Sequence, residues 1–208
     1  MIEKETLGKI SLINGDCMEV LKSLPDNAFD LAICDPPYGL SYSKHSARNN
    51  YISNDWDKNT PSREYFTELF RVSKNQIIWG GNYFDLPPTK CFVFWHKHQP
   101  VKNFADGELA WTSFNKVARC FDFSYFGNIN SEPQRIHPTQ KPVKLYGWLL
   151  NNFANTGDKI LDTHLGSGSI CLAAHDLGFE MLGIELDKEY YKAAKQRLIY
   201  HQAQLGLF

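Results

Sequence analysis

The tetrapeptide Asp35-Pro36-Pro37-Tyr38 is the sequence feature that most constrains how this chain can fold. It follows the apolar run Phe29–Cys34 and precedes Gly39. A short apolar run bounded by turn residues is typical of a buried strand in a parallel sheet. In open α/β sheets, ligands bind at the carboxyl ends of the strands. The sequence therefore predicts an α/β fold with a ligand site at the end of this strand.

The tetrapeptide offers hydrogen-bond acceptors in fixed positions. Pro36 and Pro37 lack an amide hydrogen and hold φ near about −65°, so the loop is stiff and its carbonyl groups point in defined directions. With the Asp35 carboxylate and the Tyr38 ring, these acceptors suit a planar group that carries an NH2, such as a nucleobase with an exocyclic amine. The alternative is a turn that only ends a strand, because Asp and Pro are common turn residues.

Length and composition indicate one globular domain over residues 1–208. No apolar run approaches the ~18 residues that a membrane span needs, and the amino terminus does not have the pattern of a signal peptide. The five cysteines are scattered and include no C-x-x-C pair. We therefore expect neither a disulfide framework nor a structural zinc site, and we expect a cytoplasmic protein without a membrane partner.

The net charge of −1 does not by itself indicate a nucleic-acid partner, but the charges are unevenly distributed. Residues 36–54, 86–105 and 133–157 contain no acidic side chain and several basic ones. If these stretches share a face they form a phosphate-binding surface; otherwise they are ordinary solvated loops. The candidate phosphate contacts are Lys44, His45, Arg48, Lys97, His98, Lys102 and Arg135.

Apolar runs alternate with amphipathic segments along the chain. This pattern predicts a doubly wound, Rossmann-like fold with a mostly parallel twisted sheet and helices on both faces. We expect 108–114 and 120–126 to pair with each other, and 39–60 to be a mobile loop because it is long and polar. The expected strands are 10–13, 29–34, 76–79, 91–95, 108–114, 120–126, 159–161 and 181–184, and the expected helices are 17–24, 61–72, 142–153, 170–177 and 188–200.

A second candidate site follows the predicted strand at 159–161. Gly166-Ser167-Gly168-Ser169 leads into a helix, and Glu185 ends the next strand, nineteen residues after Gly166. Glycines let a ligand approach the backbone, a helix amino terminus offers free N–H groups, and an acid at this spacing can hold ribose hydroxyls. These features indicate a nucleoside-containing cofactor. Since the third glycine of G-x-G-x-x-G is absent, a generic Rossmann turn is the alternative.

The two sites together resemble the amino-DNA methyltransferases of the permuted (β) class, in which the catalytic motif precedes the cofactor motif. Asp35-Pro36-Pro37-Tyr38 is similar to the catalytic motif of this family. His137-Pro138-Thr139-Gln140-Lys141-Pro142 resembles its H-P-T-x-K-P segment. The stretches 79–84 and 108–111 are similar to small phage-type members.

The cofactor segment also resembles this family, with departures. Residues 162–169 are similar to D-P-F-x-G-S-G-T, and Glu185 is similar to the ribose-binding acid. Thr163 and His164 stand where the family has Pro and Phe, and Ser169 replaces Thr. We expect His164 to fill the place of the aromatic ring and not to bind a metal ion.

The resemblance implies a site-specific enzyme that moves a methyl group from S-adenosylmethionine to the exocyclic amine of a flipped-out adenine in duplex DNA. An exocyclic-amine cytosine methyltransferase is the alternative, and a non-catalytic DNA- or cofactor-binding module is the alternative of a different class. The implied catalytic residues are Asp35, Pro36, Pro37 and Tyr38. The implied cofactor-binding residues are Asp16, Cys17, Asp35, His137, Thr139, Lys141, Asp162, His164, Gly166, Ser167, Gly168, Ser169 and Glu185.

The resemblance also implies roles for individual residues. Asp35 and the Pro36 carbonyl would accept the two amine hydrogens, so that the nitrogen lone pair can attack the methyl group, while Tyr38 stacks on the base. Asp16 would lie beside the cofactor adenine; the alternative is a helix cap. Lys141 would face the cofactor carboxylate; the alternative is a surface lysine.

Target recognition is expected from the segment 108–135. Because this segment is short, we expect a short or relaxed recognition sequence, or a homodimer that shares the task. No metal site is expected. His96 and His98 have the spacing of a chelating pair, but no third ligand lies near them in the sequence.

Overall fold

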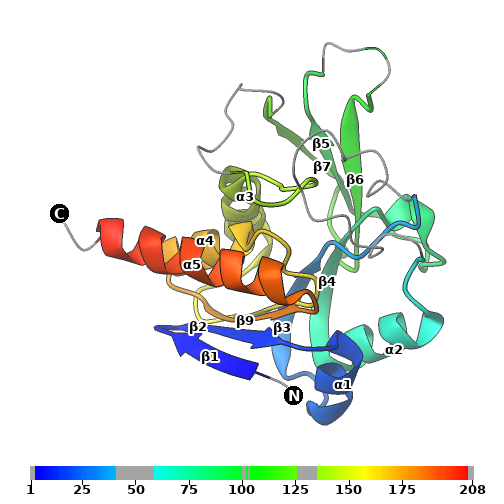
Figure 1. Ribbon diagram of the computed structural model, residues 1–208. Coiled ribbons are helices and arrows are strands. Elements are labelled where there is room, and N and C mark those ends of the chain that lie inside the picture. Colours follow the sequence, from blue (N-terminus) through cyan, green and yellow to red (C-terminus); the bar gives the residue numbers. More distant parts are fainter. Residues whose placement is uncertain (1–2, 41–58, 100–101, 103, 126–134, 206–208) are drawn as a thin grey trace.

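All strands of the described residues belong to one mixed sheet. The computed structural model describes residues 3–40, 59–99, 102, 104–125 and 135–205. Within them, nine strands lie in the order β1-β2-β9-β8-β3-β4-β6-β5-β7 (Figure 1). Their bounds are β1 Glu3–Leu7, β2 Ile10–Asn14, β3 Phe29–Cys34, β4 Ser73–Trp79, β5 Phe92–His96, β6 Gly107–Thr112, β7 Arg119–Asp122, β8 Lys159–Asp162 and β9 Glu180–Glu185.

Strand direction decides which residues meet at the edge of the sheet. β2, β9, β8, β3 and β4 are mutually parallel. β6 runs antiparallel to both β4 and β5, and β7 runs parallel to β5. The carboxyl ends of β2, β9, β8, β3, β4, β5 and β7 therefore share one edge, which also receives the amino end of β6. We call this the site edge.

The predicted sheet needs two corrections. β1 and β6 are antiparallel to their neighbours, so the sheet is mixed and the expectation of a mostly parallel sheet is only loosely met. The predicted pairing of 108–114 with 120–126 is wrong, since β5 lies between β6 and β7. Both edges of β6 are already paired, with β4 and β5, so β7 can pair only with the outer edge of β5.

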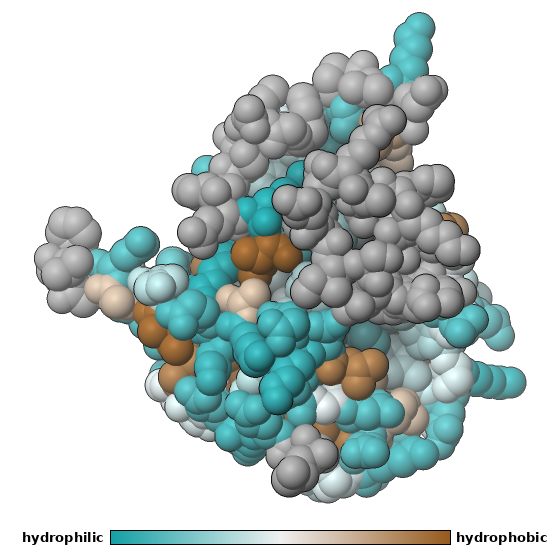
Figure 2. Space-filling view, viewed as in Figure 1, coloured by the Kyte–Doolittle hydropathy of each residue, from teal (hydrophilic) through white to brown (hydrophobic). Residues whose placement is uncertain are grey.

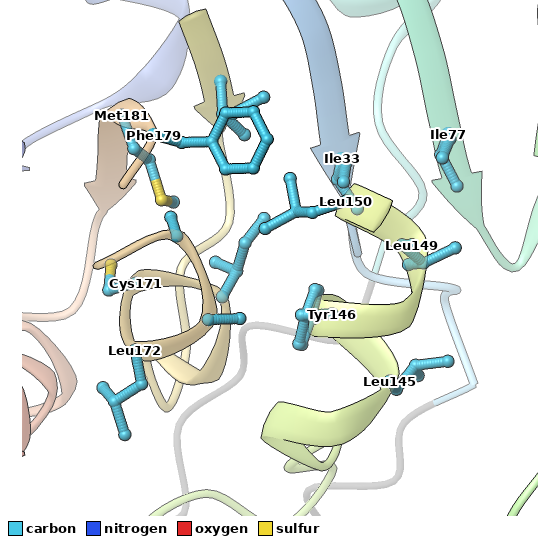
Figure 3. Close-up of a cluster of buried hydrophobic side chains, with 14 of the residues drawn as sticks. Ile33, Ile77, Leu145, Tyr146, Leu149, Leu150, Cys171, Leu172, Phe179 and Met181 are labelled. Atoms are coloured by element: carbon cyan, nitrogen blue, oxygen red, sulfur yellow. The ribbon is translucent and has the colours of Figure 1, made fainter. Parts of the chain in front are cut away.

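Helices cover both faces of the sheet, as the sequence predicts. One hydrophobic cluster joins α3, α4 and α5 to the sheet, and a second joins α1 and α2 to its other face (Figure 1). Figure 3 shows Leu145, Leu149 and Leu150 of α3 lying near Ile33 and Ile77 of the sheet. The helices are α1 Cys17–Ser23, α2 Arg63–Val72, α3 Val143–Phe153, α4 Ser169–Asp176 and α5 Lys188–Leu205, and a short 3-10 helix, η4, spans Gly81–Tyr83.

β3 is buried on both faces, which fixes the position of the loop that follows it. Ile33 is fully buried in the α3–α5 cluster, and Cys34 is buried in the α1–α2 cluster. Cys34 is therefore a core residue, as predicted. Because side chains alternate along a strand, the next residue, Asp35, points toward the face that α3 covers.

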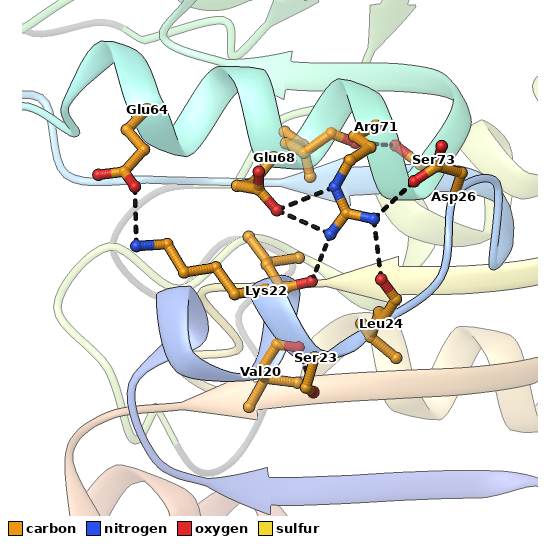
Figure 4. A network of polar contacts seen from close by, with 11 residues as sticks. Val20, Lys22, Ser23, Leu24, Asp26, Glu64, Glu68, Arg71 and Ser73 are labelled. Atoms are coloured by element: carbon orange, nitrogen blue, oxygen red, sulfur yellow. Dashed lines mark hydrogen bonds and ion pairs between the residues drawn. The ribbon is translucent and has the colours of Figure 1, made fainter.

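Arg71 of α2 joins the two helices on the other face (Figure 4). Its guanidinium donates to the carbonyl oxygens of Leu21 and Leu24 at 2.9 and 2.8 Å and to the carboxylates of Glu68 and Asp26. Both carbonyls lie at the end of α1, where the regular helix hydrogen bonds stop, and the Leu21 carbonyl also accepts the Leu24 N–H at 3.1 Å. Arg71 of α2 thus donates hydrogen bonds to the carboxyl end of α1.

We expect Arg71→Met to lower the free energy of unfolding clearly more than Lys22→Met does. Lys22 forms a single 2.7 Å ion pair with Glu64, and both side chains are more than half exposed. Exposed pairs of this kind contribute little, whereas Arg71→Met removes the guanidinium hydrogen bonds to two carbonyls of α1 and to two carboxylates. Urea denaturation of both variants at pH 7 measures the difference, and equal losses would contradict this account of Figure 4.

The described surface is mostly hydrophilic on the face seen in Figure 2, where hydrophobic residues form separate small patches. Within the described residues, the structure contains no helix that combines the length and the apolar character required to cross a membrane.

Candidate active site

Asp35 lies at the site edge, directly after β3, and both of its carboxylate oxygens have partners. The Tyr38 hydroxyl donates to Oδ1 at 2.5 Å, and the Lys141 ammonium contacts Oδ2. The Asp35 side chain is only 17% exposed. The acceptor predicted from the sequence is therefore held in one orientation by two donors, one from its own loop and one from the segment before α3.

Lys141 is the centre of a chain of alternating charges. Its side chain is 4% exposed, and its ammonium lies 3.1 Å from Glu108 Oε2 as well as against Asp35; Lys97 contacts the other oxygen of Glu108. Burial opposes the charge of Lys141, but Asp35 and Glu108 outweigh it and raise its pKa. Burial likewise opposes the charge of Glu108, yet Lys141 and Lys97 lower its pKa to about 2. Lys141 and Glu108 are therefore both charged at neutral pH.

This arrangement corrects the interpretation of Lys141. It is not a surface lysine: its buried ammonium pairs with the carboxylates of Asp35 and Glu108. Its contact with the cofactor carboxylate stays a prediction. Sequence reasoning missed Glu108 as a site residue. Glu108 reaches the site because β6 runs antiparallel to its neighbours and brings its amino end to the site edge.

Tyr38 is fixed by its ring as well as by its hydroxyl. The ring stacks on Tyr83 with centroids 5.1 Å apart and lies against Gly80, where a Cβ would come within 2.2 Å of it. Gly80 also has φ +68°, which favours glycine. Burial and the Asp35 charge raise the pKa of Tyr38, so its hydroxyl remains a donor. Tyr83, which is 45% exposed, therefore covers part of the ring that was predicted to stack on a base.

The glycine loop follows β8, and β8 lies between β3 and β9 in the sheet. The tips that carry Asp35, Gly166 and Glu185 therefore belong to adjacent parallel strands. Glu185 Oε2 accepts the Gly166 N–H at 2.7 Å, so the acid and the loop predicted to share a cofactor are in direct contact. Burial raises the pKa of Glu185.

Arg197 of α5 holds the glycine loop from behind. Its guanidinium donates to the Ser167 carbonyl at 2.8 Å and to Ser169 Oγ at 2.9 Å, and the two serine hydroxyls lie 3.1 Å apart. Ser167 and Ser169 are buried, so their side chains stabilise the turn. At Gly168, with φ +69°, a Cβ would meet Ala194 of α5 at 3.0 Å. Sequence reasoning missed Arg197 because α5 lies far along the chain.

Thr163 and His164, the two departures from the family pattern, form a hydrogen-bonded chain with α2. The Tyr65 hydroxyl lies 2.7 Å from Thr163 Oγ1, which lies 2.9 Å from His164 Nδ1. The His164 ring packs edge-on against Tyr65, as expected of a residue that replaces an aromatic ring. Burial lowers the pKa of His164 to about 4, so its imidazole is neutral.

Other predicted cofactor residues lie near the glycine loop or at the start of α1. His137 faces Gly166, and Thr139 Oγ1 lies 3.1 Å from His137 Nδ1. Burial, with the nearby charge of Lys141, lowers the pKa of His137 to about 4. Asp16 caps α1 by accepting the Met18 N–H at 2.8 Å, and burial raises the pKa of the adjacent Cys17 thiol to about 12.

Asp162 ends β8 as a buried acid. Its carboxylate accepts the His164 N–H at 2.9 Å. Burial raises its pKa from 3.8 to about 8, and the negative charges of Asp35 and Glu185 act in the same direction. The folded protein therefore holds a proton on Asp162 at neutral pH that the unfolded chain releases.

We expect the stability of the protein to fall as the pH rises from 6.5 to 8. A raised carboxyl pKa stabilises the folded state below that pKa, and this contribution is lost as the pH rises through it. A proton retained over this interval is worth about 2 kcal/mol. Asp162→Asn, which mimics the neutral acid, should lack the decline. Urea denaturation of the wild type and of Asp162→Asn at both pH values measures how much stability each protein loses. Contributions of other groups cancel when the two losses are compared, and equal losses would contradict the prediction.

The predicted DNA contacts are only partly described. Lys44, His45, Arg48 and most of the expected mobile loop 39–60 lie outside the described residues. Among the others, Lys97 pairs with Glu108 and takes part in the charge chain.

The last three predicted DNA contacts lie at the surface. His98 contacts Asp122 and is about half exposed. Lys102 is exposed. Arg135 is also exposed and lies over the Tyr125 ring, with its guanidinium carbon 5.2 Å from the centroid.

Three adjacent strand tips thus carry a fixed hydrogen-bond acceptor, Asp35, a glycine loop and an acid, Glu185. Such an arrangement can hold two ligands side by side. Residues 78–196, more than half of the chain, match the DNA methylase family of N6 and N4 enzymes. The chain belongs to this family, which confirms the prediction of a DNA methyltransferase.

Two relatives are similar to this chain in sequence, and two solved structures are similar to it in fold. YubD of Escherichia coli (strain K12) is 27% identical over 89% of this chain and 88% of its own length, and the type II methyltransferase M.HinfI of Haemophilus influenzae is 26% identical over 90% and 68%. The fold is similar to that of M1.HpyAVI in complex with SAM (TM-score 0.64, 21% identity, 91% and 100% covered). It is also similar to that of the cytosine-N4-specific PvuII DNA methyltransferase (TM-score 0.63, 17% identity, 90% and 86% covered).

Proposed function

We propose that this enzyme transfers a methyl group from S-adenosylmethionine to the exocyclic amine of a flipped-out adenine in duplex DNA, as a member of the permuted β class. The observation that carries the proposal is the position of Asp35. It is held at the tip of β3 by Tyr38 and Lys141, and β3 pairs directly with β8, which leads into the glycine loop. Amine acceptor and cofactor loop are therefore neighbours.

The residues at the β8 and β9 tips fit a nucleoside cofactor. Gly166 and Gly168 give a turn without side chains before the amino terminus of α4, and Glu185 presents a carboxylate beside Gly166. Glu185 would hold the ribose, and the cofactor would supply an electrophilic methyl group when bound. The other proposed cofactor contacts are Asp16, Cys17, Asp35, His137, Thr139, Lys141, Asp162, His164, Ser167 and Ser169.

Asp35 can accept an amine hydrogen without giving up its present partners. An ionised carboxylate has about four lone-pair sites, of which Tyr38 and Lys141 occupy one on each oxygen. The Pro36 carbonyl would accept the second amine hydrogen, and Pro37 keeps the loop stiff. Holding both hydrogens localises the nitrogen lone pair toward the methyl group. Alignment and fixed electrostatics then lower the barrier.

The target base reaches this site only after it leaves the duplex, which costs a few kcal/mol. In the proposed complex, Tyr38 and Tyr83 form an aromatic surface on which the base stacks, which offsets part of that cost. Lys102 and Arg135 are proposed to contact phosphates, together with Lys44, His45 and Arg48 of the segment outside the described residues. The segment 108–135 would read the bases, alone or in a homodimer.

The exocyclic amine of cytosine is the second candidate target, because Asp35 and Pro36 can hold either amine. Mass spectrometry of nucleosides from DNA incubated with the enzyme and S-adenosylmethionine decides between the targets. We expect N6-methyladenine. N4-methylcytosine alone would exclude adenine but keep the reaction class, and no methylated base on DNA of varied sequence would favour a non-catalytic binding module.

A further inference from the structure

Three side chains of types that can bind a metal ion lie close together at the site edge, outside the residues assigned to methyl transfer. His96, His98 and Asp122 each offer one ligand atom, and these atoms all lie within 4.8 Å of one another. Among the described residues this is the one such group of three histidine, cysteine or acidic side chains. We propose that His96, His98 and Asp122 bind one divalent transition-metal ion of the zinc type.

The backbone explains why these residues meet. β5 and β7 are parallel neighbours, and His96 and Asp122, the last residues of the two strands, are register partners. His98 follows two residues after His96, and its φ of +51° lies in the left-handed region that is unusual for a residue with a side chain. This turn keeps the His98 ring beside the His96 ring, with centroids 4.1 Å apart.

Both imidazoles approach the same carboxylate oxygen. His96 Nδ1 lies 3.9 Å from Asp122 Oδ1, and His98 Nε2 contacts that oxygen. An ordinary hydrogen bond between His98 and Asp122 explains only one of these approaches. The register of β5 and β7 brings His96 to the same oxygen, so the ligand atoms of all three side chains gather at one place.

The ligand set determines the class of ion. Two imidazole nitrogens and one carboxylate oxygen suit Zn²⁺ and its transition-metal neighbours, whereas Mg²⁺ and Ca²⁺ prefer oxygen ligands. Zinc bonds of ~2.0–2.2 Å place tetrahedral ligand atoms ~3.4 Å apart, so a shift of roughly 1 Å in these side chains closes the site. They can make it, since they are between 37% and 61% exposed. Three protein ligands leave a further position for solvent.

The proposed metal site lies next to the charge chain without being part of it. Lys97 stands between the two histidines in the sequence and contacts Glu108, which in turn contacts Lys141. An ion bound by His96 and His98 would fix the backbone on both sides of Lys97. The metal site does not depend on which base is methylated.

Metal titration of the full-length protein tests the proposal. Isothermal titration with Zn²⁺ and visible absorption with Co²⁺ should both give one equivalent bound to the wild type. His96→Ala, His98→Ala and Asp122→Asn should each lower the affinity at least about tenfold, as the loss of even an outer-shell partner does. Zn²⁺ should also raise the melting temperature of the wild type but not of these variants.

Two variants serve as matched controls. His201→Ala removes a histidine that pairs with Asp176 at 2.6 Å elsewhere on the surface, and Cys120→Ser removes an exposed thiol of β7. Both should bind the metal as the wild type does. The proposal is wrong if the wild type binds no stoichiometric Zn²⁺ or Co²⁺, if Asp122→Asn and His98→Ala keep full affinity, or if either control variant loses it.

Discussion

The Asp35→Asn enzyme is expected to methylate DNA at least about 10²-fold more slowly than the wild type at saturating DNA and cofactor. The change keeps the size of the side chain but replaces one acceptor oxygen by an NH2 donor. This donor would face either the Tyr38 hydroxyl or the Lys141 ammonium, and it could not accept a hydrogen from the target amine. Single-turnover transfer of a tritiated methyl group measures the loss.

Asp30→Asn is the matched control for this experiment. Asp30 lies on the same strand, and its carboxylate pairs with Lys74 at 2.7 Å, but it lies near the opposite end of β3. We expect Asp30→Asn to keep the wild-type rate. Equal rates for Asp35→Asn and the wild type would falsify the assignment of Asp35 as the amine acceptor, while the family membership would stand.

Lys141→Met is expected to destabilise the protein by about 3–5 kcal/mol, because it removes one partner of a buried ion pair and leaves the other behind. Methionine retains much of the aliphatic volume, so the loss reports mainly on the charge. Among the contacts of the described residues given above, Asp35 would keep Tyr38 and Glu108 would keep Lys97. Urea denaturation at pH 7 measures the difference in the free energy of unfolding.

Two further variants separate charge from position. Lys144→Met removes an exposed lysine of α3 whose ammonium lies 5.2 Å from the Phe123 ring, and it should cost less than about 1 kcal/mol. In the Lys141→Met protein, an additional Glu108→Gln change removes one of the two carboxylates left behind, so it should restore part of the lost stability. If Lys141→Met costs no more than Lys144→Met, the charge chain is not a stabilising feature.

The catalytic loop and the glycine loop could be predicted because their signals are local. Phe29–Cys34 is apolar except for Asp30 and is bounded by turns, and the structure has a strand over the same residues. Gly166 and Glu185 are spaced as two consecutive parallel strands require, and they meet as predicted. β1 was missed because Glu3–Leu7 is short and largely exposed and three of its five residues are charged, so it lacks the pattern of a buried strand.

The charge chain and the metal ligands could not be predicted because they depend on strand order and direction. Nothing in the residues around Glu108 shows that β6 runs opposite to β4 and β5, yet this direction alone places Glu108 beside Lys141. Asp122 is far from His96 in the sequence, and the two become neighbours only because β7 pairs with β5 and not with β6. Propensity patterns do not contain this information.

The reversed direction of β6 also separates two kinds of connection. The turn between β6 and β7, residues 113–118, lies at the edge of the sheet opposite the catalytic groups, whereas the connection between β5 and β6 returns beside them. Extra length in the first turn would lie away from Asp35 and Lys141, while extra length in the second would lie at the same edge of the sheet as these residues. For protein engineering, the turn at 113–118 is therefore a place for an insertion that stays away from Asp35 and Lys141.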